Sequence, residues 1–174
     1  MIFGVVGPSG AGKDTLIRGA MAARPDLRLV RRVITRPSDA GGEDFEGVTI
    51  EDFLVRCNRG EFALHWIAHG LHYGIPQAQL DGPGDVIFNG SRAALATAAA
   101  IFPDLRVILV TAPDAVLAAR LADRGRESGP DISARLARAA FALPDGISAT
   151  IVMNDGTPEA GVAQLLAALQ PIRA

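Results

Sequence analysis

The sequence predicts an α/β fold built on a doubly wound parallel sheet of the P-loop NTPase type, with about five strands. Short apolar runs without polar–apolar alternation are typical of strands buried on both faces of a parallel sheet. The runs are Ile2–Val6, Leu29–Ile34, Val86–Phe88, Val107–Val110 and Thr150–Val152. Helical segments separate them, and such alternation implies right-handed crossovers. The length of 174 residues predicts a single domain over residues 1–174.

A glycine-rich loop follows the first strand. The motif Gly-x-x-x-x-Gly-Lys spans Gly7–Lys13, and a helix is expected over Asp14–Ala23. Strand, loop and helix in this order define a P-loop, whose backbone N–H groups bind phosphate oxygens beside a helix N-terminus. Lys13 is the only lysine, and every other Lys/Arg position is arginine. The residues predicted to bind the phosphates of ATP are Gly7, Pro8, Ser9, Gly10, Ala11, Gly12, Lys13, Asp14 and Thr15.

Asp14 occupies the position where a P-loop usually has a serine or threonine that ligates Mg²⁺, and Thr15 follows it. A carboxylate beside a triphosphate repels it unless a cation lies between them, so the sequence predicts a Mg²⁺ requirement. Asp14 could hold the metal directly or through water, or Thr15 could supply the hydroxyl. Equally, Asp14 could be an acidic residue stabilised by the dipole of the helix N-terminus.

The other helices of the predicted sheet have recognisable starts. Ser91 precedes one helix, and Thr157 precedes another that has Pro158 at its first position. These helices are expected at Arg92–Ile101, Pro113–Asp123, Ile132–Leu143 and Pro158–Leu169.

Residues 35–84 interrupt the strand–helix alternation and predict a small inserted lobe over the P-loop, and the family resemblance described below implies that this lobe binds the phosphate acceptor. A short helix is expected to start within Thr49–Asp52 and to run to about Arg59, followed by a hairpin over Phe62–Tyr73 with His69 and Gly70 near its turn. A second excursion is rich in glycine and charge and predicts a mobile lid region over residues 124–135.

Composition excludes several classes of function. The net charge of −2 and the pI of about 5.9 give little support for nucleic-acid binding. The single Cys57 cannot form an intramolecular disulfide, and no apolar stretch is long enough to span a bilayer. Met1 is followed at once by the first strand, so a cytoplasmic location without a signal peptide is expected. The oligomeric state is left open, with a homodimer among the possibilities.

Together, these segments resemble the guanylate-kinase-like branch of the P-loop kinases over nearly the whole chain. The motifs that carry the resemblance are Gly7–Lys13, Thr35-Arg36-Pro37 with Gly42-Glu43, Gly60-Glu61-Phe62 with His69-Gly70 and Tyr73-Gly74, Arg120-Leu121 with Arg124-Gly125, Arg135-Leu136, and Asn154-Asp155. The residues that read guanine in those enzymes are missing. Leu64 stands where a glutamate is expected, and Ile75 stands where a threonine follows Tyr-Gly.

A phosphoryl-transfer site without purine-reading residues resembles the ribose 1,5-bisphosphate phosphokinase family, in which an aspartate also follows the P-loop lysine. The matching stretches are residues 7–14, 31–37, 41–44, 62–66, 68–76 and 89–92. The resemblance implies that ATP phosphorylates ribose 1,5-bisphosphate to 5-phospho-α-D-ribose 1-diphosphate, in phosphonate catabolism. Two alternatives stay open: a kinase for GMP or another nucleoside monophosphate, and a non-catalytic module that binds protein partners.

The resemblance also implies roles for residues outside the P-loop. Arg124 and Arg135 would join Lys13 as catalytic residues by closing over the transferred phosphate. Asn154 would lie near the adenine. The residues expected to bind the phosphorylated sugar are Arg36, Tyr73, Asn89, Ser91 and Arg92. Arg32 could assist them or face solvent, and Glu43 could bind a ribose hydroxyl or a second Mg²⁺, or be a solvated loop acid.

Overall fold

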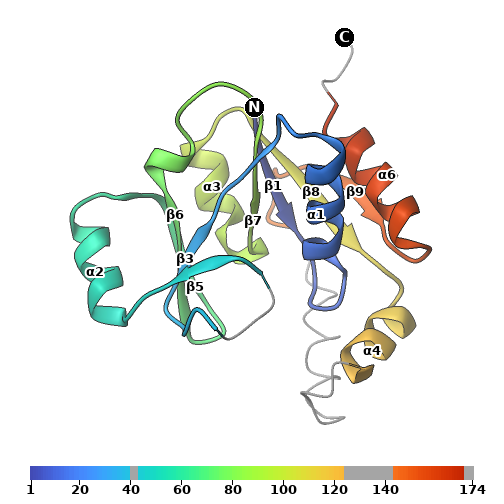
Figure 1. The fold of residues 1–174 in the computed structure, drawn as a ribbon, viewed down its shortest axis with the longest axis horizontal. Coiled ribbons are helices and arrows are strands. Elements are labelled where there is room, and N and C mark those ends of the chain that lie inside the picture. The colour runs from blue at the N-terminus through green and yellow to red at the C-terminus, as the bar shows by residue number, and fades with distance from the viewer. Residues whose placement is uncertain (40–42, 124–142, 171–174) are drawn as a thin grey trace.

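A computed structural model gives the fold of the chain and describes residues 1–39, 43–123 and 143–170. Its centre is a five-stranded sheet in the order β2–β7–β1–β8–β9, with all neighbouring strands parallel (Figure 1). The strands are β1 (Ile2–Val6), β2 (Arg28–Leu29), β7 (Val86–Asn89), β8 (Leu105–Thr111) and β9 (Ala149–Met153). The predicted fold class is therefore confirmed.

Helices cover both faces of this sheet. On one face, α1 (Lys13–Ala23), α4 (Asp114–Asp123) and α6 (Pro158–Ala168) pack on alternate strand residues such as Phe3 and Val5, which are fully buried. On the other face, a 3₁₀ turn η2 (Arg92–Ala94) leads into α3 (Leu95–Ile101). Neighbouring residues of a strand point to opposite faces, so both faces of the central strands are apolar.

A second, four-stranded sheet forms the inserted lobe. Its strands are β3 (Arg32–Ile34), β4 (Phe45–Gly47), β5 (Phe62–Ala68) and β6 (Leu71–Pro76), in the order β4–β3–β6–β5. The helix α2 (Ile50–Asn58) lies on the side of this sheet that faces away from the five-stranded sheet, and a short turn η1 (Gln77–Gln79) follows β6 (Figure 1). The predicted helix and hairpin of this lobe are confirmed, and His69 and Gly70 form the turn between β5 and β6 with φ of 52° and 73°.

The prediction of one continuous strand over Leu29–Ile34 is wrong. The run Leu29–Ile34 is not continuous, because β2 ends at Leu29 in the parallel sheet and β3 begins at Arg32 in the lobe sheet. Between them the amide of Val30 still donates to the carbonyl of Ile87, while Arg31 faces solvent. The chain therefore passes from one sheet to the other at the two arginines in the middle of this run, Arg31 and Arg32, and the lobe sheet starts before residue 35.

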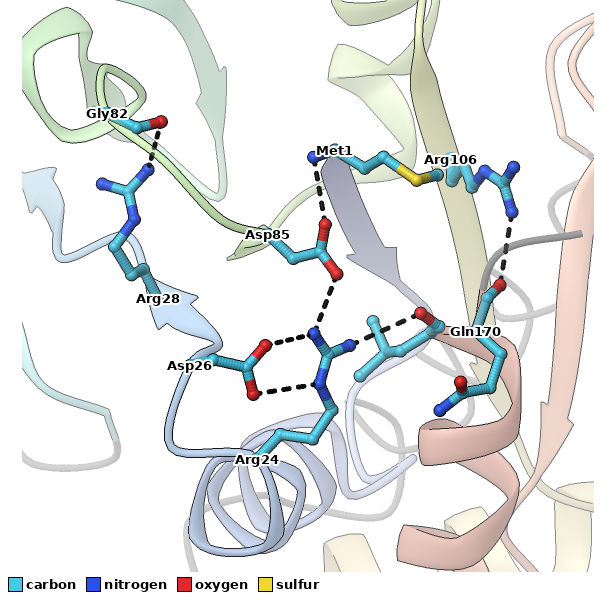
Figure 2. A network of polar contacts seen from close by, with 9 residues as sticks. Met1, Arg24, Asp26, Arg28, Gly82, Asp85, Arg106 and Gln170 are labelled. Carbon is cyan, nitrogen blue, oxygen red and sulfur yellow. Dashed lines mark hydrogen bonds and ion pairs between the residues drawn. The ribbon is translucent and has the colours of Figure 1, made fainter.

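A charged network ties the chain together at the edge of the sheet opposite the P-loop (Figure 2). The guanidinium of Arg24, which caps the C-terminus of α1, contacts the carboxylates of Asp26 at 2.6 Å and Asp85 at 2.9 Å. Asp85 also binds the amino group of Met1 at 3.0 Å, and Arg24 donates to the carbonyl of Leu169. The network joins the start of β1, the approach to β7 and the ends of α1 and α6.

Two further expectations concern residues 124–143 and membrane-spanning helices. Most of the predicted helix Ile132–Leu143 and the whole lid region 124–135 lie outside the described residues. Among the described helices, none combines the length and the apolar character that a membrane span requires.

Candidate active site

The P-loop connects β1 to α1 and depends on glycine for close backbone approaches. A Cβ on Gly7 would lie 1.9 Å from the carbonyl oxygen of Val110, on the neighbouring strand β8. Gly12 has φ of 89° and forms the N-cap of α1 in the left-handed conformation. No side chain caps α1, so the amides of its first turn remain available to an anion.

Lys13 folds back over this loop. Its Nζ donates to the carbonyl oxygens of Gly7 at 2.9 Å and Pro8 at 3.2 Å. Burial lowers the pKa of Lys13 from 10.5 to about 8; the carboxylate of Asp14 partly opposes this shift, and the charge of Arg32 adds to it. Burial therefore makes the charged form of Lys13 unfavourable in the free protein. A bound phosphate stabilises that charged form, so the side chain is suited to bind phosphate.

Asp14 is held in place by a residue from another strand. The side-chain amide of Asn89, at the carboxyl end of β7, donates to Oδ1 of Asp14 at 2.7 Å. Asn89 is buried, whereas Thr15 is exposed at the same helix turn. An oriented carboxylate beside the P-loop provides the hard oxygen ligand that Mg²⁺ prefers, so the residues present fit this ion.

Two residues support the P-loop from behind. The buried side chain of Asn154 donates from Nδ2 to the carbonyl of Ala11 at 2.7 Å, and its backbone N–H donates to Thr111 at 2.7 Å. From α4, Arg120 donates to the carbonyl of Gly10 at 3.4 Å. The contact that the structure gives Asn154 is therefore with the loop itself, and its predicted place near adenine stays a prediction.

A cleft of about 520 Å³ lies between the P-loop and the lobe. Six of the side chains predicted to bind substrate or take part in catalysis line this cleft: Lys13, Arg36, Tyr73, Asn89, Ser91 and Arg92. Segments far apart in the sequence supply them, because the carboxyl ends of β1 and β7 meet at one edge of the parallel sheet. Ligands of such sheets bind at this edge.

Arg32 faces this cleft and is buried, with 6% of its surface exposed. Its guanidinium forms a forked ion pair with the carboxylate of Glu43, in which Nε donates at 3.1 Å. This excludes the solvent-facing alternatives, because Arg32 is buried and Glu43 is paired with it, whereas their roles toward substrate or Mg²⁺ stay predictions. The pairing could not be found from local sequence, since eleven residues separate the partners.

The lobe wall of the cleft is aromatic. Trp66 and Tyr73 are directly opposite each other on β5 and β6, and their rings stack with centroids 5.3 Å apart and planes inclined by 5°. The guanidinium of Arg32 lies 5.3 Å from the centre of the Tyr73 ring and 6.0 Å from that of Trp66. Burial raises the pKa of Tyr73, an effect that Arg32 and Arg36 oppose, so its hydroxyl remains a donor at neutral pH.

The two positions where guanine-reading residues were expected are apolar and fully buried. Leu64 and Ile75 are also opposite each other on β5 and β6, with exposures of 1% and 0%. They pack with Trp66, Phe88 and other apolar residues into one cluster between the lobe and the sheet. This cluster offers no side-chain hydrogen-bond acceptor to a guanine edge.

Two further arginines of the site lie in different surroundings. The guanidinium of Arg36 lies 4.2 Å from the centre of the Phe45 ring. Burial lowers the pKa of Arg92, but this guanidinium remains charged. Ser91 accepts a hydrogen bond from the amide of Ala93 at 3.3 Å and caps the turn η2, as predicted. The predicted catalytic residues Arg124 and Arg135 lie outside the described residues.

The histidines do not form a metal site in the described part of the chain, where no group of three His, Cys, Asp or Glu side chains could hold an ion. His65 is exposed, and His72 packs against the ring of Phe53 with centroids 5.4 Å apart. His69 lies in the hairpin turn at the edge of the cleft.

Comparisons with known proteins agree with this geometry. The chain is 48% identical to ribose 1,5-bisphosphate phosphokinase PhnN of Ruegeria sp. (strain TM1040) over 177 residues, covering 99% of this chain and 93% of that protein. It is 46% identical to the Rhizobium etli protein of the same name, covering 98% and 89%. It is also 49% identical to part of a bifunctional ribose 1,5-bisphosphokinase-thymidine phosphorylase of Azorhizobium caulinodans, covering 97% of this chain but 25% of that protein. No protein-family model matches.

Solved structures show the same fold at low sequence identity. Guanylate kinase from Anaplasma phagocytophilum superposes with a TM-score of 0.67 at 17% identity, covering 98% of this chain and 87% of that one. A gluconokinase from Sinorhizobium meliloti 1021 gives a TM-score of 0.56 at 14% identity, covering 96% and 90%.

Fold and site together define a P-loop kinase with a guanylate-kinase-like architecture. The two PhnN relatives match over nearly their full length at 46–48% identity. The chain belongs to the ribose 1,5-bisphosphate phosphokinase family, as the sequence motifs predicted.

Proposed function

We propose that this protein transfers the γ-phosphoryl group of ATP to the C1 phosphate of ribose 1,5-bisphosphate. A bond forms between an oxygen of the C1 phosphate and the γ-phosphorus, the bond from the γ-phosphorus to the β-phosphate oxygen breaks, and ADP leaves. The product, 5-phospho-α-D-ribose 1-diphosphate, keeps its 5-phosphate. The observation that carries the proposal is that Lys13 of the P-loop lines the same cleft as Arg36 and Arg92.

The cleft supports this reaction through positioning and charge. The acceptor oxygens are already anionic at neutral pH, so the reaction requires no general base. Lys13 and the amides of the P-loop hold the β- and γ-phosphates of ATP, while Arg36, Arg92 and the hydroxyl of Tyr73 hold the phosphates of the acceptor. Asn89 and Ser91, which line the same cleft, are proposed to contact ribose hydroxyls. Arg124 and Arg135 are proposed to close over the transferred group.

Mg²⁺ is part of the proposal. Asp14, oriented by Asn89, would hold it directly or through water, with Thr15 as the alternative ligand. When bound, the ion neutralises charge between the β- and γ-phosphates. The reaction is proposed to occur in the cytoplasm and to serve phosphonate catabolism.

The test is ADP release from ATP and Mg²⁺ with either ribose 1,5-bisphosphate or GMP as acceptor, with products identified by phosphorus NMR. The expected product is a diphosphate at C1 of ribose, with no GDP. Lys13→Ala is the control and should lose at least about 10³-fold in turnover, because it removes a cation from the transferred phosphates. GDP as the main product would contradict the proposal.

A further inference from the structure

The only tryptophan of the chain stacks on its only tyrosine, in the wall of the cleft. Trp66 is 7% exposed, and its indole lies nearly parallel to the phenol ring of Tyr73 at a centroid distance of 5.3 Å. This is the arrangement that a planar base adopts on an aromatic side chain. The ring face of Tyr73 on that side is therefore already occupied by a side chain of the protein.

The register of the hairpin fixes this contact. Trp66 and Tyr73 are paired residues of β5 and β6, and the next pair on the same face is Leu64 with Ile75. Both members of that pair are fully buried, and Trp66 packs with them in one apolar cluster. The indole is thus held from one side by the cluster and from the other by the Tyr73 ring.

Arg32 adds a third constraint. Its guanidinium lies 5.3 Å from the centre of the Tyr73 ring and 6.0 Å from that of Trp66 and is forked to Glu43, so a ring that turned away would lose its contact with a fixed cation. A base entering beside Tyr73 would have to displace Trp66 from a packed environment, whereas a sugar phosphate has no planar group that needs this space.

We infer that Trp66 determines acceptor specificity by filling the space in which a nucleobase would stack on Tyr73, so that the cleft excludes nucleoside monophosphates and admits a base-free sugar phosphate. This inference rests on the proposed function, because it takes the cleft to be the acceptor site. It adds a steric exclusion to the loss of polar base-reading groups at Leu64 and Ile75.

The test compares Trp66→Ala with Trp66→Phe, which keeps an aromatic ring on Tyr73. Phe102→Ala is the matched control, because it removes an aromatic ring from the edge of the same cluster but does not line the cleft. With the donor site saturated by a non-hydrolysable ATP analogue, GMP binding is measured by calorimetry. Trp66→Ala should bind GMP at least about tenfold more tightly than the unmodified protein, as expected for one added base–aromatic stack. Trp66→Phe and Phe102→Ala should not.

A folded Trp66→Ala protein that binds GMP no better than Phe102→Ala would overturn the inference. If Trp66→Ala fails to fold, the unmodified protein can test the inference instead, because all of its tryptophan fluorescence comes from Trp66. With the donor site saturated, ribose 5-phosphate should change that fluorescence in a saturable way and GMP should not. A saturable GMP signal would show a base beside the indole and refute the exclusion.

These measurements report binding and are independent of turnover. If Trp66→Ala gains GMP binding but ribose 1,5-bisphosphate is not phosphorylated, the proposed function fails and the exclusion stands. If ribose 1,5-bisphosphate is phosphorylated but Trp66 can be removed without any gain in GMP binding, the proposed function stands and the exclusion fails.

Discussion

The side-chain amide of Asn89 donates to the carboxylate of Asp14 at 2.7 Å, across 75 positions of sequence. The contact joins the carboxyl end of β7 to the first turn of α1, beside the P-loop. It orients the carboxylate of Asp14 at the position where a hydroxyl residue is usual, which supports the proposal that this carboxylate holds Mg²⁺.

Removing this contact should weaken metal binding. Asn89→Ala is expected to reduce Mn²⁺ affinity, measured by electron paramagnetic resonance with a bound ATP analogue, by about 10- to 100-fold, the usual effect of losing a group that orients a metal ligand. The half-saturating Mg²⁺ concentration in turnover should rise in parallel. If only the KM for the acceptor rises, the contact of Asn89 with Asp14 does not support metal binding.

The affinity for ATP should depend on the protonation of Lys13. Its pKa of about 8 in the free protein means that it is charged below this pH and neutral above it. Bound phosphates favour the charged form, so above pH 8 ATP binding should take up a proton and affinity should fall as pH rises. Calorimetry in two buffers of different ionisation enthalpy counts this proton. No uptake above pH 8 would show that the lysine is already charged before ATP binds.

Arg36 should act on the acceptor and not on ATP. Arg36→Ala is expected to raise the KM for ribose 1,5-bisphosphate by about 10- to 100-fold, the loss of one charge-assisted contact to phosphate, with little change in the KM for ATP. Arg31→Ala is the control, because the Arg31 side chain is exposed, forms an ion pair with Asp44 at 2.9 Å and donates to the carbonyl of Phe45, and is not among the described residues that line the cleft. Equal effects of Arg36→Ala on both substrates would remove it from the acceptor site.

Asn154 should stabilise the P-loop. Asn154→Ala leaves the carbonyl of Ala11 without its donor and should destabilise the fold by about 1–3 kcal/mol. For a chain of this size, Tm should fall by roughly 2–10 °C, and ATP affinity should fall with it. Gln164→Ala is the control, because that exposed amide bonds the backbone of Met153 and not the P-loop. Unchanged stability with a selective change in adenine preference would instead support the predicted position near the base.

Restoring the missing glutamate should destabilise the protein before it changes specificity. Leu64→Glu places a carboxyl in an apolar cluster at a position with 1% exposure, at a cost of about 3 kcal/mol at neutral pH. Burial raises the pKa of such a carboxyl, so the loss should be complete above the raised pKa and should shrink as pH falls toward 4. Leu54→Glu, on the exposed face of α2 at 48% exposure, should change Tm little. Denaturant unfolding at two pH values checks both.

Much of this architecture could be predicted because its signals are local. The P-loop, the caps at Thr157 and Ser91, and the His69–Gly70 turn each depend on residues within one short segment. The run Leu29–Ile34 contains Arg31 and Arg32 where the chain changes sheets, but two arginines do not specify which strands each half pairs with.

The site could be predicted only in outline. The sequence does not distinguish Arg32 from any other basic residue. Its setting depends on Glu43, Trp66 and Tyr73, which three different segments bring around it. The contact of Asn89 with Asp14 likewise depends on the side-by-side pairing of β1 with β7, which no local pattern specifies.

In a chain with one lysine, amine reagents find one side-chain target, Lys13 in the phosphate-binding loop, besides the α-amino group of Met1. At mildly alkaline pH much of Lys13 is in the nucleophilic, neutral form, because its pKa is near 8. Acylating or aldehyde reagents that carry a phosphate would therefore mark the nucleotide site selectively. Bound ATP should protect Lys13 from the reagent. Mass measurement of the intact protein would then give the fraction of molecules whose nucleotide site is occupied.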